Sequence, residues 1–102
     1  MAQRESTTNK TDDRVLALRR KGKGFQSIAG AVGLAKASDA NKAFNRALRR
    51  LPDAEAATVR SEEDGRLDRL ATLTRENDAF TEEEVERRLG VIERLRTRLH
   101  KA

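Results

Sequence analysis

The sequence predicts an all-α fold, in which an N-terminal unit of three helices is followed by a C-terminal helical hairpin. Three observations indicate this class: apolar residues recur at helical spacing along most of the chain, β-branched and aromatic residues are scarce, and the single Pro separates two helical patterns. At 102 residues with 38% charged side chains, the chain suits a small helical protein that exposes much of its surface.

The segment 1–11 is expected to be a disordered basic and polar arm, because its residues offer little to bury. A first helix is expected at about 12–21. Thr11 or Asp12 can cap its N-terminus, and Gly22 is expected to end it.

Two further helices are expected at 25–32 and 39–51. The first has apolar residues at i, i+3, i+4 and i+7, and the second has six within an arc of roughly 140°. These residues are Phe25, Ile28, Ala29 and Val32, and then Ala40, Ala43, Phe44, Ala47, Leu48 and Leu51. Gly33 tolerates a positive φ, Ser38 is expected to cap the second helix, and Pro52 ends it. The small residues Ala29, Gly30 and Gly33 are expected to let the helices approach closely, as in a helix-turn-helix.

The other face of the second of these helices carries side chains of the types that proteins use to contact DNA. Lys and Arg neutralise phosphates or reach guanine, and Asn pairs bidentately with adenine. We therefore expect residues 39–50 to enter the major groove of duplex DNA, with Asn45 and Arg49 reading bases. The expected contact residues are Ser38, Asn41, Lys42, Asn45, Arg46 and Arg49, with Gln26 and Lys36 on the DNA backbone. The alternative is a solvated helix face.

The net charge is distributed unevenly along the chain. Residues 1–51 contain 12 Lys and Arg against 4 Asp and Glu, a net of +8, whereas residues 52–102 contain 10 against 13, a net of −3. The positive charge therefore lies with the expected DNA-binding unit at 12–52. Arg4 and Lys10 of the arm can also touch a minor groove, although an untethered tail is the simpler expectation.

The segment 53–102 is expected to form a helical hairpin that supports self-association. One helix is expected at about 54–75, or two shorter helices meeting near residues 62–65, with an apolar stripe through Ala56, Val59, Glu63, Leu67, Leu70 and Leu73. Thr81 and Glu84 form a capping box at the start of the last helix. Its narrow apolar seam favours pairing within the hairpin, pairing between subunits, or both. The residues expected to support a homo-oligomer, a dimer or larger, are Leu70, Val85, Leu89, Ile92 and Leu99.

Several short motifs resemble those of known DNA-binding proteins. They are LRR at 18–20, GFQSIA at 24–29, VGL at 32–34, AFNRAL at 43–48, RLDRL at 66–70 and VIERL at 91–95. The first three resemble the trihelical domain of many prokaryotic DNA-binding proteins. The last three resemble small terminase subunits of tailed phages and related actinobacterial proteins. The resemblance covers residues 12 to about 99, and it implies a DNA-site reader followed by an oligomerisation module.

No cluster of residues predicts an active site. His100 is the only His and Cys is absent, so neither a catalytic dyad nor a thiolate metal site is expected. We expect no enzymatic activity, no cofactor, no metal and no membrane segment, and a cytoplasmic location. The expected function is non-enzymatic binding of double-stranded DNA by an oligomer, in DNA packaging, recombination or transcription regulation. The alternative is a helical protein-interaction or scaffold module whose basic half does not read DNA.

Overall fold

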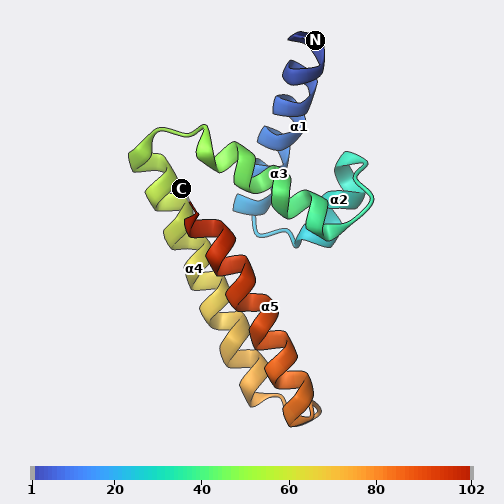
Figure 1. Cartoon of the computed structure of the whole chain (residues 1–102), viewed down its shortest axis with the longest axis vertical. Coiled ribbons are helices and arrows are strands. Elements are labelled where there is room, and N and C mark those ends of the chain that lie inside the picture. The colour runs from blue at the N-terminus through green and yellow to red at the C-terminus, as the bar shows by residue number, and fades with distance from the viewer. Residues whose placement is uncertain (1, 102) are drawn as a thin grey trace. The chain divides into compact units, whose positions relative to one another are not determined.

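Five helices make up the regular structure of the described chain (Figure 1). The computed structural model describes residues 2–101, with side chains from residue 7 onward. The helices are α1 (Ala2–Arg20), α2 (Phe25–Val32), α3 (Ala37–Arg49), α4 (Asp53–Glu76) and α5 (Glu82–His100). No strand occurs among the described residues, so the predicted all-α class is confirmed.

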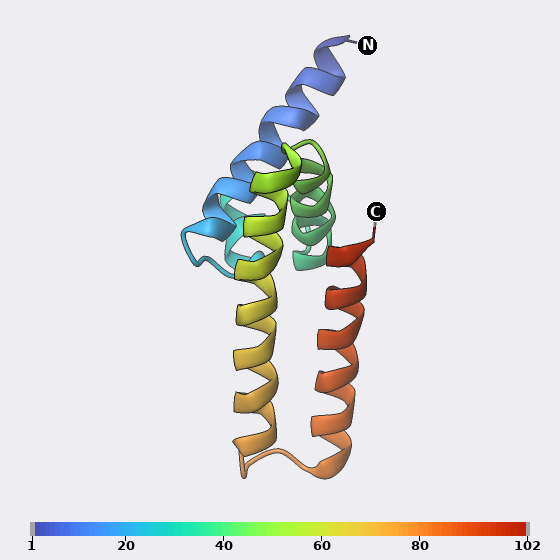
Figure 2. The same cartoon turned by 90° about the vertical axis from the view of Figure 1, so that its left-hand side faces the viewer.

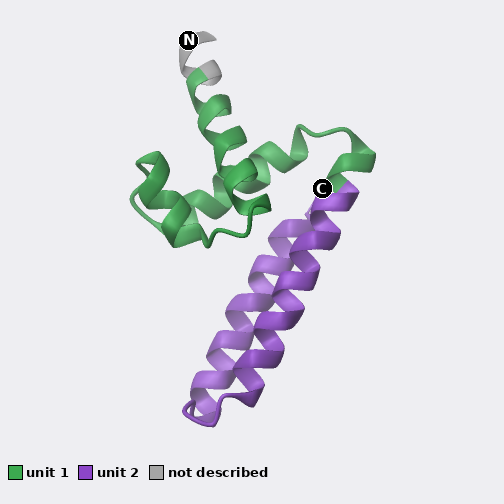
Figure 3. Cartoon of the chain, turned by 180° about the vertical axis from the view of Figure 1, so that it is seen from behind, with its two compact units in different colours: residues 1–56 green, residues 57–102 purple. Residues whose placement is uncertain are grey.

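The chain divides into two compact units, which Figure 3 colours separately. Unit 1 is Met1–Ala56 and contains α1, α2, α3 and the first residues of α4. Unit 2 is Ala57–Ala102 and contains the rest of α4 and all of α5. The boundary predicted at residue 53 is where α4 starts, whereas the compact units separate a few residues later, inside this helix.

Unit 1 buries one face of each of its first three helices. The buried apolar residues are Val15 and Leu16 of α1, Ile28 and Ala29 of α2, and Ala40, Ala43, Phe44, Ala47 and Leu48 of α3. Phe44 also meets Phe25 edge to face, with ring centroids 5.7 Å apart. Full burial of a side chain such as Phe44 or Ile28 stabilises the fold by about 1.5–3 kcal/mol. Of the six apolar positions predicted for the α3 segment, all but Leu51 are buried.

A four-residue turn joins α2 to α3. Gly33 ends α2 with a positive φ of 79°, and its N–H donates to Ala29 O. The Leu34 N–H donates to the same carbonyl at 2.8 Å, which closes the last turn of α2. Lys36, with an extended φ of −139°, then precedes α3 directly and makes no side-chain capping bond. The prediction that Ser38 caps α3 is therefore wrong, because an N-cap needs a non-helical backbone and Ser38 already lies inside the helix.

Gly30 and Gly33 differ in backbone conformation, because Gly33 alone of the two has a positive φ, and a Cβ added to either would meet no heavy atom within 4 Å. The prediction that Gly30 and Gly33 permit a close helix approach is therefore wrong, and Gly30 is exposed on α2. We expect Gly30→Ala to raise the free energy of unfolding by about 0.5–1 kcal/mol through helix propensity. Gly33→Ala is expected to lower it by about 1–2 kcal/mol, because alanine is strained in the left-handed region. Urea unfolding followed by circular dichroism measures both, and changes of the same sign would contradict this assignment.

Helix α1 extends further toward the N-terminus than the sequence predicts. Residues 2–11 are helical, so the expectation of a disordered arm is wrong for these residues. Contacts from the far end of α3 account for part of the difference, at residues 9–13 of α1. Arg50 Nη2 donates to the Asn9 carbonyl at 3.4 Å and to Asp13 Oδ1 at 2.9 Å. These partners are 41 and 37 residues away, and a local sequence pattern cannot reveal them.

In unit 2, α5 returns antiparallel to α4 after the loop at residues 77–81 (Figures 1 and 2). Arg96 of α5 bridges the two helices, because its Nη1 donates to Asp64 Oδ1 at 2.8 Å and its Nη2 to Asp68 Oδ1 at 2.7 Å. Helix α5 starts as predicted: Thr81 is its N-cap, and Thr81 Oγ1 accepts a hydrogen bond from the Glu84 N–H at 3.1 Å. The hairpin predicted for this half of the chain is therefore present.

The buried face of α4 departs from the predicted stripe in its second half. Leu70 and Leu73 are 48% and 64% exposed, whereas Ala71 and Thr74 are buried. The next buried residue after Leu67 is Ala71, four residues later, whereas the predicted stripe continued to Leu70, three residues later. Both steps fit a period of 3.6 residues, so periodicity alone cannot choose between a leucine at i+3 and an alanine at i+4. The larger side chains consequently lie outside the seam.

Candidate nucleic-acid interface

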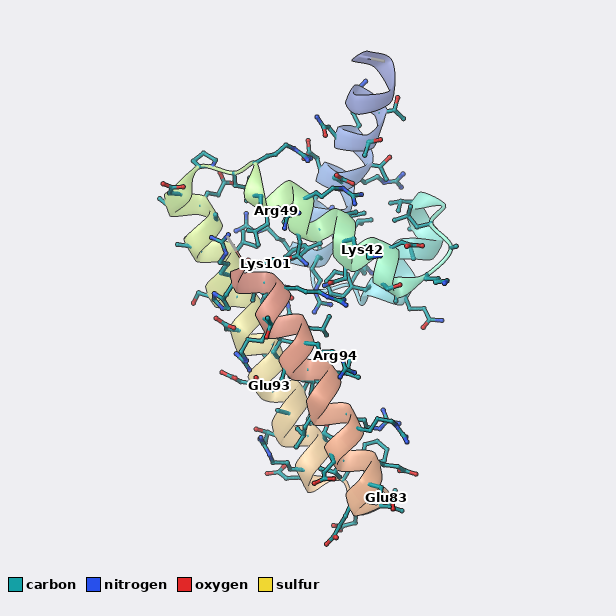
Figure 4. All side chains as sticks on the ribbon, viewed as in Figure 1. Lys42, Arg49, Glu83, Glu93, Arg94 and Lys101 are labelled. Carbon is teal, nitrogen blue, oxygen red and sulfur yellow. The ribbon has the colours of Figure 1, made fainter. Side chains whose placement is uncertain are left out.

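The exposed face of α3 is narrow and basic. At about 100° per residue, Ser38, Lys42 and Arg49 lie within about 40° of one another and opposite the buried apolar arc. All three are exposed, and we call them the α3 ridge. The side chains of Lys42 and Arg49, both labelled on α3 in Figure 4, form no ion pair or hydrogen bond with another described residue. One side of α3 thus presents two cations that have no side-chain partner among the described residues.

Asn41 and Asn45 do not belong to the α3 ridge. They are 6% and 5% exposed, and Asn45 Nδ2 donates to Asn41 O at 3.0 Å and to Asn41 Oδ1 at 3.2 Å. The predicted DNA contact of Asn41 and the predicted base readout by Asn45 are therefore wrong for this conformation. The reason is their position around α3. Viewed down the helix axis, Asn41 and Asn45 lie roughly 20° and 60° beyond Leu48, so they border the apolar arc.

Arg46 is held by a buried carboxylate from α1. Its Nε donates to Asp12 Oδ2 at 2.8 Å and its Nη2 to Asp12 Oδ1 at 2.9 Å, which makes a bidentate pair. Asp12 is 1% exposed, whereas the Arg46 side chain keeps 45% of its surface. Hydrogen bonding to Asp12 raises the pKa of Arg46 despite partial desolvation, so the guanidinium stays charged. Arg46 therefore joins α3 to α1, and nearly half of its side chain remains accessible to an anion.

Arg50 extends this arrangement at the end of α3. Its Nη1 lies 3.5 Å from Asp12 Oδ2, in addition to the contact of its Nη2 with Asp13. The sequence analysis missed the roles of Asp12 and Arg50, although one signal was present. Asp12 precedes Val15 and Leu16 by three and four residues, which puts it on the buried face of α1. A carboxylate on a buried face requires a cation, which here comes from another helix.

The two residues expected to contact the DNA backbone are exposed near the starts of α2 and α3. Gln26 is the second residue of α2, and Lys36 immediately precedes α3. A helix N-terminus directs unpaired N–H groups outward, where they can meet an anion. Both placements are compatible with phosphate contact, which stays a prediction. Lys10 is exposed on α1, and the side chain of Arg4 lies outside the described residues.

Comparisons of this chain with protein-family models, with curated proteins and with solved structures give no match. The resemblance to helix-turn-helix proteins and small terminase subunits therefore remains a prediction from the motifs. No helix of the described chain is long and apolar enough to cross a membrane. Among the same residues, no group of three or more His, Cys, Asp or Glu side chains is arranged to hold a metal ion.

The residues predicted to support self-association fall into three groups by exposure. Ile92 and Leu99 are 3% and 4% exposed within the single chain, so the prediction that they contact a second chain is wrong for the folded hairpin. Val85 and Leu89 are half-buried beside them on α5. Pairing within the hairpin, one of the alternatives that the narrow seam allowed, accounts for their burial. Of the predicted set, Leu70 alone is an exposed side chain.

Proposed function

We propose that this chain is a non-enzymatic duplex-DNA-binding protein, in which α2 and α3 act as a helix-turn-helix and α3 enters the major groove. The observation that carries the proposal is the α3 ridge, where Lys42 and Arg49 are exposed and have no partner among the described residues. The ridge lies opposite the buried face of α3. The helix can therefore approach a groove without giving up its core contacts.

Within this proposal the basic side chains have different roles. Arg49 reads a base, because a guanidinium can pair bidentately with O6 and N7 of guanine, and Lys42 neutralises a phosphate as a point charge. Arg46 lies at the margin of the α3 ridge and adds positive charge there, while its Nε and Nη2 donate to Asp12. With Asn45 buried, fewer side chains remain to read bases. We therefore expect modest sequence preference and a large contribution from phosphate contacts.

Affinity for a duplex is expected to fall steeply with salt, because each neutralised phosphate releases condensed cations. Lys42→Ala is expected to reduce the slope of log K against log salt by about 1, for every duplex sequence. Fluorescence anisotropy of a labelled duplex across a salt series measures both quantities. Arg94→Ala is the matched control, since Arg94 is exposed on α5 (Figure 4) and has no partner among the described residues.

Three outcomes count against the proposal: no binding, binding that does not change with salt, and equal changes of slope for Lys42→Ala and Arg94→Ala. Each of them would favour the competing function, a helical protein-interaction or scaffold module whose basic half only keeps the protein in solution. The collection of unpaired cations on one face of one helix favours DNA over this alternative.

The biological role that fits this proposal is DNA packaging, recombination or transcription regulation. In each of these roles the protein acts as a homo-oligomer of two or more chains. An oligomer would bring two copies of α3 to one duplex, so the second contact would form at a high effective concentration.

A further inference from the structure

The large apolar side chains that stay exposed in the described chain all lie in unit 2. They are Leu70 and Leu73 of α4, 48% and 64% exposed, and Val91 of α5, 43% exposed. Exposed apolar residues that stand singly are ordinary on protein surfaces, whereas a contiguous group marks an interaction site. Whether these three residues form one surface depends on their positions around the two helices.

Helical geometry puts all three on one edge of the hairpin. The opposite edge is marked by Arg96, which pairs with Asp64 and Asp68. At about 100° per residue, the two leucines lie roughly 170° around α4 from these aspartates, and Val91 lies roughly 140° around α5 from Arg96. The antiparallel pairing of residue 96 with residues 64 and 68 also sets Val91 level with residue 71, between the two leucines. We call Leu70, Leu73 and Val91 the apolar edge.

The charges beside the apolar edge are self-complementary. Arg69 precedes Leu70, and Glu76 follows Leu73, on the same side of α4 because they are seven residues apart. Both are exposed, and neither pairs with another described residue. When two copies of α4 pack antiparallel about a two-fold axis near residue 72, Arg69 of each copy faces Glu76 of the other. The same axis brings Leu70 of each copy to Leu73 of the other.

A shallow hollow on α4 adjoins Leu73 and adds to this surface. Its volume is about 320 Å³, and its walls are Asp68, Arg69, Thr72 and Leu73. Because Leu73 forms one wall, an apolar side chain of a second helix that packs on the apolar edge has space to insert beside it. Such insertion of side chains between those of the facing helix is how paired helices bury their apolar surfaces.

We propose that the apolar edge is a homodimer interface, at which a second copy of this chain packs its α4 antiparallel to that of the first. An unrelated partner would have to supply an acidic and a basic residue in the reverse order around an apolar centre, whereas a second copy already carries them. Two-fold symmetry makes each favourable contact occur twice. This inference adds the contact surface to the homo-oligomer of the proposed function, and it holds or fails without DNA.

Sedimentation of the full chain over the micromolar concentration range tests the interface. The wild type is expected to be a reversible dimer, and Leu70→Gln combined with Leu73→Gln is expected to raise its dissociation constant by at least about tenfold. Because both leucines are about half-exposed or more, the hairpin is expected to remain folded, which circular dichroism checks. A wild type that stays monomeric throughout this range, or a dimer that the double substitution leaves unchanged, would overturn the proposal.

A charge exchange gives a second test that does not depend on removing apolar surface. Arg69→Glu and Glu76→Arg each place like charges opposite each other in a homodimer, so each variant alone is expected to be a monomer. Mixed together, they are expected to form heterodimers, because both cross-contacts then join a glutamate to an arginine. Native mass spectrometry separates these species. Arg75→Glu is the control and is expected to retain the homodimer, because Arg75 is exposed about 140–160° around α4 from the two leucines and has no partner among the described residues.

A mixture of the two exchanged variants that stays monomeric would overturn the two-fold arrangement. A wild-type dimer that behaves as expected in both experiments but does not bind DNA would reject the proposed function and leave the interface intact.

Discussion

Replacing Arg46 with alanine is expected to lower the free energy of unfolding of unit 1 by about 2–3 kcal/mol. The change removes two charge-assisted hydrogen bonds, at 2.8 and 2.9 Å, from Asp12, which is 1% exposed. Arg50, at 3.5 Å, is then the nearest cation that remains. The partial exposure of Arg46 keeps the effect below that of a fully buried pair. Urea unfolding followed by circular dichroism measures the change.

Arg49→Ala is the matched control for this experiment. Arg49 lies on the same helix, is exposed and has no partner among the described residues, so its removal is expected to change the stability by no more than about 0.5 kcal/mol. The double variant Asp12→Ala with Arg46→Ala is expected to be more stable than Arg46→Ala alone, because it removes a buried carboxylate that would keep only the long contact with Arg50. Equal losses for Arg46→Ala and Arg49→Ala would contradict a structural role for the pair.

The pair between Asp12 and Arg46 also decides how substitutions on α3 are interpreted. A loss of DNA affinity in Arg46→Ala combines a lost contact with a weakened unit 1, and binding data alone cannot separate the two. Lys42 and Arg49 avoid this difficulty, because no described side chain depends on them. These two residues are therefore the informative positions for testing the interface.

Elements with a strong local signal could be predicted from the sequence. The helix expected at 25–32 has those bounds in α2, because four apolar positions and Gly33 specify it within one short stretch. Thr81 marks the start of α5 for a similar reason, since the N-cap bond forms within three residues. The helical state of residues 2–11 has no such local signal, and the contact that Arg50 makes with Asn9 in this stretch comes from 41 residues away in the sequence.

The candidate site could be predicted in part, and the wrong predictions about its residues have one physical cause. Lys42 and Arg49 are exposed as their positions around the helix require, since a long charged side chain is rarely buried without a partner. Asn45 is polar but uncharged, so a local hydrogen bond to Asn41 is enough to allow its burial. Asp12 shows the converse case, in which Arg46 of α3 and Arg50, the residue after α3, compensate a buried charge. Polarity alone therefore does not determine exposure at the margin of an apolar arc.

Reversing both charges of the α3 ridge is expected to have the largest effect on function. In the double variant Lys42→Glu with Arg49→Glu, the affinity for duplex DNA at low salt is expected to fall by about 100-fold or more, since a base contact and a phosphate contact are both lost and become repulsive. Neither side chain has an intramolecular partner in the described structure, so the free energy of unfolding is expected to change little. Fluorescence anisotropy measures the affinity, and urea unfolding checks the fold.

The double variant Arg87→Glu with Arg94→Glu is the control for this experiment. It shows whether the affinity for DNA depends on where the positive charges lie or on the net charge alone. Both arginines are exposed on α5 without a partner among the described residues, and either double variant lowers the net charge from +5 to +1. Charges that do not touch the DNA are screened by salt, so the control is expected to lose no more than about threefold in affinity at physiological ionic strength. Equal losses in the two double variants would mean that net charge alone drives binding, and α3 would then have no special place in it. A loss confined to the α3 variant would instead identify this helix as the surface that meets the duplex.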